Sequence, residues 1–495
     1  MELKIRNLSI SSGGPLVAIL NEEDSVKLDL KALDRVKLKK GSKEAVVIID
    51  IAKRSIKKGT ISLFDEVINE LQAKNNEKVC VSQEPLPQSL QYIKKKLDGG
   101  DLSKMEINEI VKDIVLKKLS EVEITYFVVA CYINGLTLYE SAYLTEAIVE
   151  NGKKLSLKKY PILDKHSLGG IPGNRTTPIV VSIVAANGFI IPKTSTRSIT
   201  SVSGTADTVE VFAPVSHPIE KIEEIVKKTN GCMVWGGALE LASADDKLIK
   251  IEKALSIDPR GIMLASILAK KAAVGATHVV IDMPIGKGSK VVSKKEANIL
   301  KRKFLQLGKL LGMELKIVMT DGTEPIGNGL GPALEARDIL LTLQNKGPEP
   351  LKKKALILTS TLLGMVGVKN PYKKALETLE SGAAYTKFKD IIKAQGGNPN
   401  VRVSDIKIGK FKSDVKAKEN CIIKELDNKL LTSIAKSAGA PFDKGAGIYL
   451  NVHVKDKVKK GGILYTIYAE RKQKLDYTLK LFKKIPIICE PIKNQ

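Results

Sequence analysis

The sequence predicts a multidomain protein that combines α/β and α+β architecture. We expect a small β-rich N-terminal domain, a helical lobe, a mostly parallel-sheet α/β lobe and a small α+β C-terminal domain. Two observations lead to this prediction. The chain of 495 residues is too long for one hydrophobic core. The spacing of its apolar residues also changes along the chain, from a period of two to a helical period and then to a mixture of both.

Residues 1–84 are expected to form the β-rich domain. Short apolar or alternating runs are separated by Asn, Gly, Asp and Lys, which is typical of strands joined by turns. The runs are Leu3–Ile5, Leu16–Leu20, Val26–Leu30, Val36–Leu38 and Val46–Ile51. Because this domain carries no catalytic motif, we expect it to act in assembly.

Residues 85–153 are expected to form the helical lobe. Near Pro85 and Pro87 the apolar residues take up a helical period, and Gly99-Gly100 ends the first predicted helix. We also expect a later segment, about 246–276, to join this lobe. The apolar stripes are Leu90, Ile93 and Leu97; Ile107, Ile110, Val111 and Ile114; Ile124, Phe127, Val128 and Cys131; and Leu144, Ala147 and Ile148.

Residues 154–400 show the pattern of an α/β lobe. Apolar runs at Ile179–Val184, Val279–Ile281 and Leu315–Val318 alternate with helical stretches, which predicts strands of a largely parallel sheet. Residues 401–495 form the predicted C-terminal domain. Its expected strands lie around Val401–Val403, Gly447–Val454 and Ile463–Ala469.

The net charge of +25 suggests an anionic partner. The lysines are spread along the chain and only 4% of residues are aromatic, so platforms for stacking nucleic-acid bases are scarce. We therefore expect no nucleic-acid partner. The interpretations that remain are a lysine-rich solvated surface and a charge that attracts a small, multiply charged anion.

Other broad classes are disfavoured as well. The longest apolar stretch, 178–192, is interrupted by Asn187 and Gly188 and is too short to cross a membrane. The first residues alternate polar and apolar, unlike a signal peptide. The five cysteines form no Cys-x-x-Cys pair, so we expect no zinc site and no disulfide framework. These features predict a cytoplasmic protein with no membrane partner.

A first glycine-rich segment, 164–177, combines a cation, hydroxyl groups and three glycines at 169, 170 and 173. Glycine lets backbone N–H groups approach an anion closely, and Ser and Thr hydroxyls add donors. The segment fits neither the Walker pattern nor the dinucleotide fingerprint. A phosphate cradle and an ordinary turn both remain open. His166 lies between cations, so we expect a neutral imidazole there.

A second segment, 193–207, places many hydroxyl groups around Lys193 and Arg197 after an apolar run. Ligands of α/β sheets bind at the carboxyl ends of strands, so anion binding is favoured over a plain loop. The hydroxyl-bearing residues are Thr194, Ser195, Thr196, Ser198, Thr200, Ser201 and Thr205.

A third segment runs from Ala244 to Lys271 and contains Asp258 directly before Pro259. From the residues alone, Asp258 is best explained as the cap of the helix that follows.

At these segments the sequence resembles the archaeal AMP phosphorylases, within the thymidine and pyrimidine-nucleoside phosphorylase family. The resemblance covers nearly the whole chain, including the N-terminal domain that ordinary thymidine phosphorylases lack, and the wider fold is shared with anthranilate phosphoribosyltransferase. The matching segments are 165–177, 197–201, 204–207, 236–239, 258–271 and 331–337.

The resemblance implies a helical lobe facing an α/β lobe, with phosphate and nucleotide between them. It implies phosphorolysis of AMP to adenine and ribose 1,5-bisphosphate, with CMP and UMP as further candidate substrates. No cofactor and no metal are expected, since inorganic phosphate is a co-substrate. Asp258 matches the proton donor. The implied phosphate contacts are Lys165, Ser167 and Thr205, and the implied nucleotide contacts are Gly170, Thr196, Arg197, Ser198, Ile199, Thr200, Ser201, Thr205, Ser266, Lys270 and Lys290.

The sequence departs from the family pattern at Arg260, where an acidic residue is usual. A cation so close in sequence would favour the ionised form of Asp258. Two alternatives remain: a pyrimidine-nucleoside phosphorylase, and a basic RNA-binding protein built on the same fold. For the enzyme we expect a homo-oligomer made of dimers.

Overall fold

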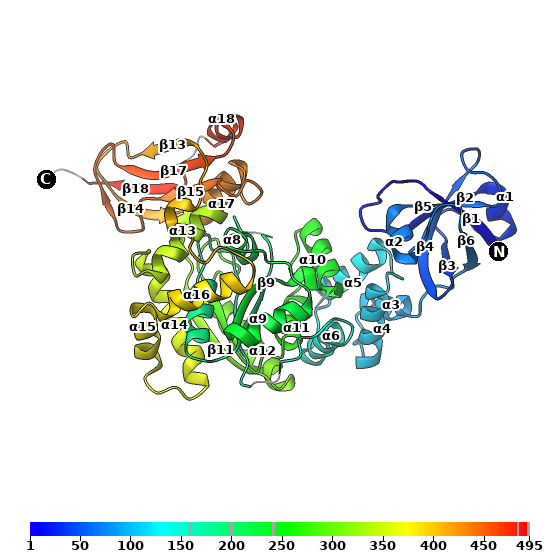
Figure 1. Cartoon of the computed structure of the whole chain (residues 1–495), viewed down its shortest axis with the longest axis horizontal. Coiled ribbons are helices and arrows are strands. Elements are labelled where there is room, and N and C mark those ends of the chain that lie inside the picture. The colour runs from blue at the N-terminus through cyan, green and yellow to red at the C-terminus, as the bar shows by residue number, and fades with distance from the viewer. Residues whose placement is uncertain (158–159, 199–200, 240–242, 483–484, 493–495) are drawn as a thin grey trace. The chain divides into compact units, whose positions relative to one another are not determined.

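The computed structural model describes residues 1–157, 160–198, 201–239, 243–482 and 485–492, and within them the chain divides into two compact units (Figure 1). One unit comprises Met1–Asn151 with Ser243–Ser266. The other comprises Gly152–Ala242 with Ile267–Gln495. The division falls inside helix α11 (Arg260–Ala273).

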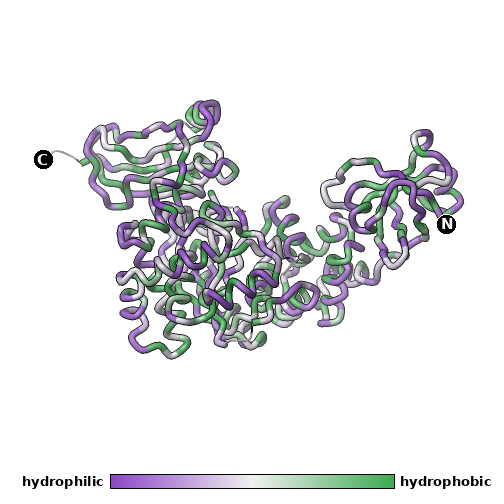
Figure 2. The backbone as a smooth tube through the Cα atoms, viewed as in Figure 1, coloured by the Kyte–Doolittle hydropathy of each residue, from purple (hydrophilic) through white to green (hydrophobic). Residues whose placement is uncertain are grey.

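The first unit begins with a closed barrel whose strands neighbour one another in the order β1 (Glu2–Asn7), β5 (Thr60–Leu63), β2 (Val17–Asn21), β4 (Lys43–Ala52), β3 (Arg35–Lys40) and β6 (Lys78–Gln83). Buried and more exposed residues alternate along β1, β3, β4 and β6, and Figure 2 shows hydrophobic and hydrophilic residues interspersed in the barrel. The β-rich prediction is therefore confirmed.

One predicted strand of this domain is wrong. Val26 and Lys27 are the last residues of a short helix, α1 (Glu22–Lys27), and residues 28–30 follow it outside any strand. The side chain of Asn21 accepts the Glu23 backbone N–H at 2.9 Å and so caps the helix. Val26 is 74% exposed, so it does not belong to the alternating core pattern. Strands β5 and β6 and helix α2 (Asp65–Leu71) were not predicted.

The predicted helices of the helical lobe are confirmed as α3 (Ser89–Leu97), α4 (Lys104–Val115), α5 (Glu121–Ile133) and α6 (Leu138–Glu150). Capping boxes at Ser103, Ser120 and Thr137 fix where α4, α5 and α6 begin. Helix α10 (Ser243–Leu255) packs against α4 and α5 within the same unit.

The second unit is built on parallel strands. Strand β10 (His278–Ile285) lies between β7 (Leu163–Ser167) and β11 (Glu314–Asp321), and both pairings are parallel. Strand β8 (Ile191–Ser195) pairs in parallel with β9 (Gly231–Trp235). A parallel bridge between Ile162 and Ile190 joins the two groups. The predicted parallel sheet and its strands at 279–281 and 315–318 are therefore confirmed.

The predicted strand at 179–184 is wrong, because these residues lie in helix α7 (Thr177–Ala186). Pro178 occupies its first turn, a position that proline favours. Every residue from Thr177 to Ala185 is buried, so the helix is apolar on all sides. A short run of that kind cannot be distinguished from a buried strand by its periodicity. The strand that leads into the hydroxyl-rich segment is β8 instead.

The remaining helices of this part are α8 (Thr205–Val209), α9 (Ile219–Thr229), α12 (Lys294–Leu310), α13 (Pro332–Leu343), α14 (Glu349–Met365), α15 (Pro371–Glu380) and α16 (Ala383–Ala394). Helices α7, α13, α14 and α16 contribute to one large apolar core with β8, β9 and β10. Among the helices in the described part of the chain, none has the length and apolar content needed to cross a membrane.

The C-terminal part contains β13 (Phe411–Lys416), β14 (Cys421–Leu426), α17 (Asn428–Ser437), β15 (Gly447–Leu450), β16 (Lys457–Val458), β17 (Ile463–Ala469), α18 (Lys472–Leu481) and β18 (Ile487–Pro491). The predicted strands near 447 and 463 are confirmed as β15 and β17. The strand predicted at 401–403 is wrong, because Val403–Asp405 form a 3₁₀ turn in which the Asp405 side chain accepts the Arg402 backbone N–H at 2.9 Å.

Candidate active site

The carboxyl ends of the parallel strands β7 and β10 bring the first glycine-rich segment together with residues far along the chain. In the register between these strands, Lys165 lies opposite Val280 and Ser167 lies opposite Asp282. Ligands of parallel α/β sheets bind at such strand ends. The segment after β7 is therefore placed where a substrate site is expected.

Lys165 is 1% exposed and points its ammonium group at the start of helix α7. It donates to Thr176 Oγ1 at 2.9 Å and to Thr177 Oγ1 at 3.4 Å. Burial lowers the pKa of Lys165 to about 8, and the nearby positive charges of Lys354 and Arg175 contribute to this shift. The predicted combination of a cation with hydroxyl groups is thus present in the folded segment.

Ser167 belongs to a hydrogen-bond network centred on Asp282. Its hydroxyl donates to Asp282 Oδ2 at 2.8 Å and accepts from Asn174 Nδ2 at 3.2 Å. The Lys354 ammonium lies 3.1 Å from the same carboxylate oxygen. The other oxygen, Oδ1, accepts from Thr320 Oγ1 at 2.7 Å. Asp282 and Lys354 were not predicted as site residues.

A second cluster of buried charges surrounds Asp164, the residue of β7 that precedes Lys165. Asp164 contacts the ammonium groups of Lys193, at 3.2 Å, and Lys271, at 2.5 Å. Burial lowers the pKa of Lys271 to about 7. His166 has a pKa well below its usual value because of burial and of the surrounding lysines. The neutral imidazole predicted for His166 agrees with this environment.

Arg197 is engaged inside the hydroxyl-rich segment. Its guanidinium forms a two-point ion pair with Glu210, at 2.7 and 2.9 Å, and contacts Asp207 at 3.3 Å. It also lies 4.8 Å from the centre of the Trp235 ring. The pKa of Arg197 is raised, first by its hydrogen bonds to Glu210. Arg197 therefore holds the segment in shape.

Two serine hydroxyls of this segment form hydrogen bonds within it. Ser198 donates to the carbonyl of Ser201 at 2.5 Å, and Ser201 donates to the carbonyl of Ser203 at 2.7 Å. Thr205 is the first residue of α8, and Thr196 lies half-buried after β8. The predicted contacts Ile199 and Thr200 lie outside the described residues.

Two predicted nucleotide contacts, Gly170 and Lys290, lie side by side. Gly170 has a φ of +90°, and a Cβ atom there would stand 2.9 Å from the Lys290 backbone nitrogen. Only glycine combines this conformation with so close an approach. The first segment is thereby held against the turn that carries the exposed side chain of Lys290.

The other predicted residues are divided between the units. Asp258 is exposed and lies between α10 and α11 in the first unit, which also contains Arg260 and the buried Ser266. Lys270 belongs to the second unit and is half-buried. The roles assigned to these residues therefore stay predictions.

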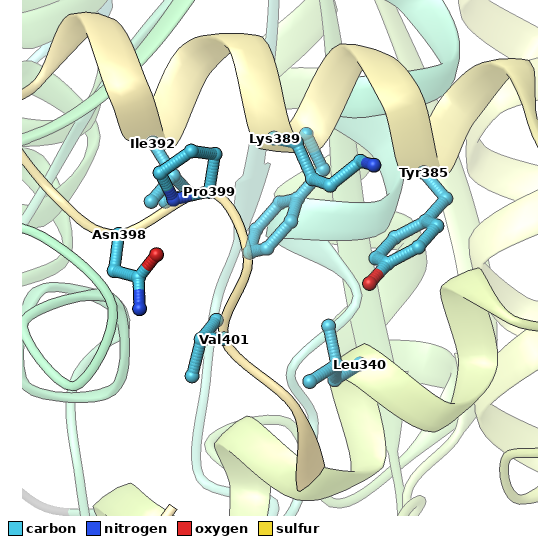
Figure 3. A pocket seen from close by; sticks show the side chains of 8 residues that line it. Leu340, Tyr385, Lys389, Ile392, Asn398, Pro399 and Val401 are labelled. Atoms are coloured by element: carbon cyan, nitrogen blue, oxygen red, sulfur yellow. The ribbon is translucent and has the colours of Figure 1, made fainter. Parts of the chain in front are cut away.

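The structure also contains a small apolar hollow away from the strand ends, between α13, α16 and the segment after α16 (Figure 3). It contains none of the predicted site residues. Its lining is Leu340, Tyr385, Phe388, Lys389, Ile392, Asn398, Pro399 and Val401. This hollow offers no arrangement suited to a phosphate or a nucleotide.

Comparison with known families agrees with this architecture. Residues 90–152 match the helical bundle domain of a glycosyl transferase family, and residues 159–385 match the a/b domain of that family. Residues 422–488 match the pyrimidine nucleoside phosphorylase C-terminal domain. The fold is similar to that of anthranilate phosphoribosyltransferase from Thermus thermophilus, with a TM-score of 0.53 and 18% identity, over 62% of this chain and 99% of that chain. Fold and strand-end site thus define a glycosyltransferase with a helical bundle and an a/b domain.

Proteins that are similar to this chain over nearly its full length identify the family within this class of glycosyltransferases. The AMP phosphorylase of Thermococcus kodakarensis is 47% identical over 100% of this chain and 98% of the relative. That of Methanococcoides burtonii is 45% identical over 98% of this chain and 96% of the relative. The chain belongs to the AMP phosphorylase family.

The lowered pKa of Lys165 predicts how phosphate use depends on pH. Below about pH 8 the side chain is a cation, and above it the charge is progressively lost. We therefore expect the KM for phosphate to rise by roughly tenfold between pH 7 and 9, as steady-state kinetics at saturating nucleotide would measure. The variant Lys165→Arg keeps its charge over this range and should give a flatter profile. A constant KM in the unmodified protein would contradict the prediction.

Proposed function

We propose that this protein splits AMP with inorganic phosphate, releasing adenine and forming ribose 1,5-bisphosphate. The observation that carries the proposal is the similarity to AMP phosphorylases, which extends over 100% of this chain and 98% of the first relative. It includes the barrel, the helical lobe and the strand-end segments alike. The substrates are thus a nucleotide and phosphate, and no cofactor is part of the proposal.

Phosphorolysis of AMP poses two chemical problems. The base is a poor leaving group unless a ring nitrogen receives a proton, and the sugar develops oxocarbenium character as the base leaves. We assign the donation of this proton to the carboxyl group of Asp258, which matches the proton donor of the family that the sequence resembles. General acid catalysis of this kind contributes roughly 100- to 10,000-fold to the rate. The attacking phosphate dianion meets the second demand through its charge and its position.

We assign the phosphate to Lys165, Ser167 and Thr205. The burial of Lys165 supports this assignment, since an ammonium group in a site with little water interacts strongly with a dianion. Ser167 stands on the same strand, two residues later, and its orientation is fixed by Asp282 and Asn174. The reaction needs no protein nucleophile, because phosphate itself attacks the anomeric carbon.

The nucleotide's 5′-phosphate distinguishes AMP from adenosine and requires a cation of its own. Arg197 and Lys290 are the candidates from the sequence. We assign the 5′-phosphate to Lys290, whose turn lies directly against Gly170 of the first segment. Arg197, which is paired with Glu210 and Asp207, takes a positioning role.

Two other functions compete with this proposal. A pyrimidine-nucleoside phosphorylase would share the C-terminal domain found at 422–488 but would not need a 5′-phosphate. A basic RNA-binding protein would retain the fold without turnover. Phosphate-dependent base release from AMP, CMP, UMP, adenosine and thymidine, measured side by side, separates these possibilities. We expect AMP to be split fastest, whereas a preference for thymidine or an absence of turnover would reject the proposal.

We further propose a cytoplasmic homo-oligomer that works without a nucleic-acid or membrane partner. The dimer forms through the helical lobe, and the barrel of residues 1–84 joins dimers into a larger assembly. The barrel supports this assignment because it is a closed module with its own core, separate from the strand-end segments.

The role of Asp258 leads to the first kinetic prediction. Asp258→Asn should lower turnover of AMP by at least roughly 100-fold while nucleotide binding survives, because an amide cannot donate the catalytic proton. Single-turnover kinetics and equilibrium binding of AMP measure the two effects. Asp246→Asn, an exposed aspartate on the preceding helix, is the matched control. Near-normal turnover of Asp258→Asn would leave Asp258 as a helix cap.

The role of Lys290 leads to a prediction about substrate choice. Lys290→Ala should raise the KM for AMP by roughly 10- to 150-fold, because a charge-assisted contact to phosphate is lost. Any activity on adenosine should change little, since adenosine lacks that group. Lys287→Ala is the control: this lysine stands in the same turn, is 80% exposed and pairs with Glu425. Equal losses on both substrates would show that Lys290 does not select the 5′-phosphate.

The assembly role of the barrel is tested by a shortened chain that begins at Gln83, the last residue of β6. We expect a smaller species that still splits AMP, because the strand-end segments remain complete. Analytical ultracentrifugation of both forms, combined with an activity assay, measures this. The same number of subunits per particle in both forms would contradict the proposal.

A further inference from the structure

Asp282 is fully buried at the carboxyl end of β10 and is the centre of the network that holds Ser167. Its carboxylate accepts hydrogen bonds from Ser167 on β7, Asn174 in the first segment and Thr320 on β11. It also forms an ion pair with Lys354 on helix α14. Although burial raises the pKa of Asp282, the charges of Lys354 and Lys165 together with the hydrogen bonds from Thr320 and Asn174 hold it below its usual value. Asp282 is therefore an anion that accepts a hydrogen bond from the Ser167 hydroxyl.

Lys354 supplies a cation from a distant part of the chain. It lies on α14, where it is 5% exposed among apolar neighbours such as Leu351, Ala355 and Leu358. Its ammonium lies 3.1 Å from Asp282 Oδ2. Burying a charged side chain in an apolar core is costly, and an apolar residue would pack there at least as well. A purely structural role thus gives little reason for a lysine at this position.

The charges around the site do not balance. In the described part of the chain, Lys165, Lys193, Lys271 and Lys354 are buried in the two clusters, against Asp164 and Asp282. Of the other buried charged groups nearby, Arg175 pairs with Glu335, and burial raises the pKa of Asp338 to about 7. The lysines outnumber the aspartates by two, and burial lowers the pKa of Lys165 to about 8 and that of Lys271 to about 7, so an anion bound beside them would favour their charged forms.

We propose that Lys354 is a positioning residue of the phosphate subsite, which acts through Asp282 to hold Ser167 and to supply part of the positive charge that the dianion neutralises. The proposal rests on phosphate being the co-substrate, as in the proposed function. Lys354 balances the negative charge of Asp282, so that the Ser167 hydroxyl can turn its single proton from Asp282 to the bound phosphate. Removing the Lys354 cation leaves Lys165 as the remaining lysine whose charge acts on Asp282, and so disturbs both phosphate contacts.

Lys354→Met tests the proposal because methionine keeps much of the length and removes the charge. We expect inorganic phosphate to bind the intact protein roughly 10- to 100-fold more weakly, as isothermal titration calorimetry would measure. The KM for phosphate should rise by the same factor, while the KM for AMP should stay within about twofold. The matched control is Lys353→Met on the same helix, where the lysine is exposed.

A structural role would give a different result. If Lys354 only fastens α14 to the sheet, Lys354→Met lowers the unfolding temperature but leaves the phosphate affinity of the folded protein unchanged, and this outcome overturns the proposal. An equal rise in both KM values, indicating general damage to the site, also overturns it.

A second variant decides the matter if Lys354→Met does not fold. Thr320→Val removes the hydrogen bond to Asp282 Oδ1 at a half-buried strand position that suits valine. We expect roughly fivefold weaker phosphate binding, and unchanged binding overturns the proposal.

Phosphate titration needs no turnover of AMP, so it tests this inference separately from the proposed function. A protein that binds phosphate through Lys354 but does not split AMP would reject the proposed function alone, whereas normal turnover with unaltered phosphate binding in the variants would reject this inference alone.

Discussion

The register between the parallel strands β7 and β10 is the constraint on which the candidate site depends. It sets Ser167 opposite Asp282, so that a hydroxyl and a carboxylate meet at the strand ends. A shift of one residue would turn Asp282 to the other face of the sheet. The buried carboxylate would then lose its donors, and Lys354 would be left as an unpaired cation in an apolar core, which is strongly unfavourable.

That register also explains why the site draws on segments far apart in the sequence. A buried carboxylate needs hydrogen-bond donors, and for Asp282 these come from neighbouring strands, from the segment after β7 and from helix α14. Lys193 on β8 and Lys271 on α11 form ion pairs with Asp164, and Lys354 on α14 forms one with Asp282. The cost of holding so many cations together is offset when a multiply charged anion binds. Four buried lysines are thereby held beside two aspartates in the folded state.

The hydroxyl-rich segment is organised by ion pairs as well as by its hydroxyls. Glu210 binds Arg197 on one side and Lys444 of the C-terminal part, at 2.9 Å, on the other. Gly204 permits this compact shape, because a Cβ atom there would stand 2.3 Å from the Thr196 carbonyl oxygen. Through Glu210, Arg197 of this segment is linked to Lys444 of the C-terminal part.

The limits of the sequence are visible in particular elements. The helices of residues 85–150 could be predicted because apolar stripes and capping boxes coincide there. Residues 179–184 and 26–30 were misassigned, since burial on all sides hides the period of α7 and the Asn21 cap overrides a short apolar run. Asp282 could have been recognised as a site residue from the sequence, because it is a single acidic residue in an otherwise apolar strand. Lys354 gave none, because Lys352 and Lys353 precede it and only one of the three is buried.

The sequence by itself determined the order of domains, the parallel α/β core, the family resemblance and the segments that carry polar chemistry, because periodicity, caps and glycines act over short distances along the chain. Only the tertiary structure decided which charges meet. Pairing depends on strand register and on which face of a helix is buried, and both are set by contacts between residues more than a hundred positions apart, such as Ser167 with Asp282.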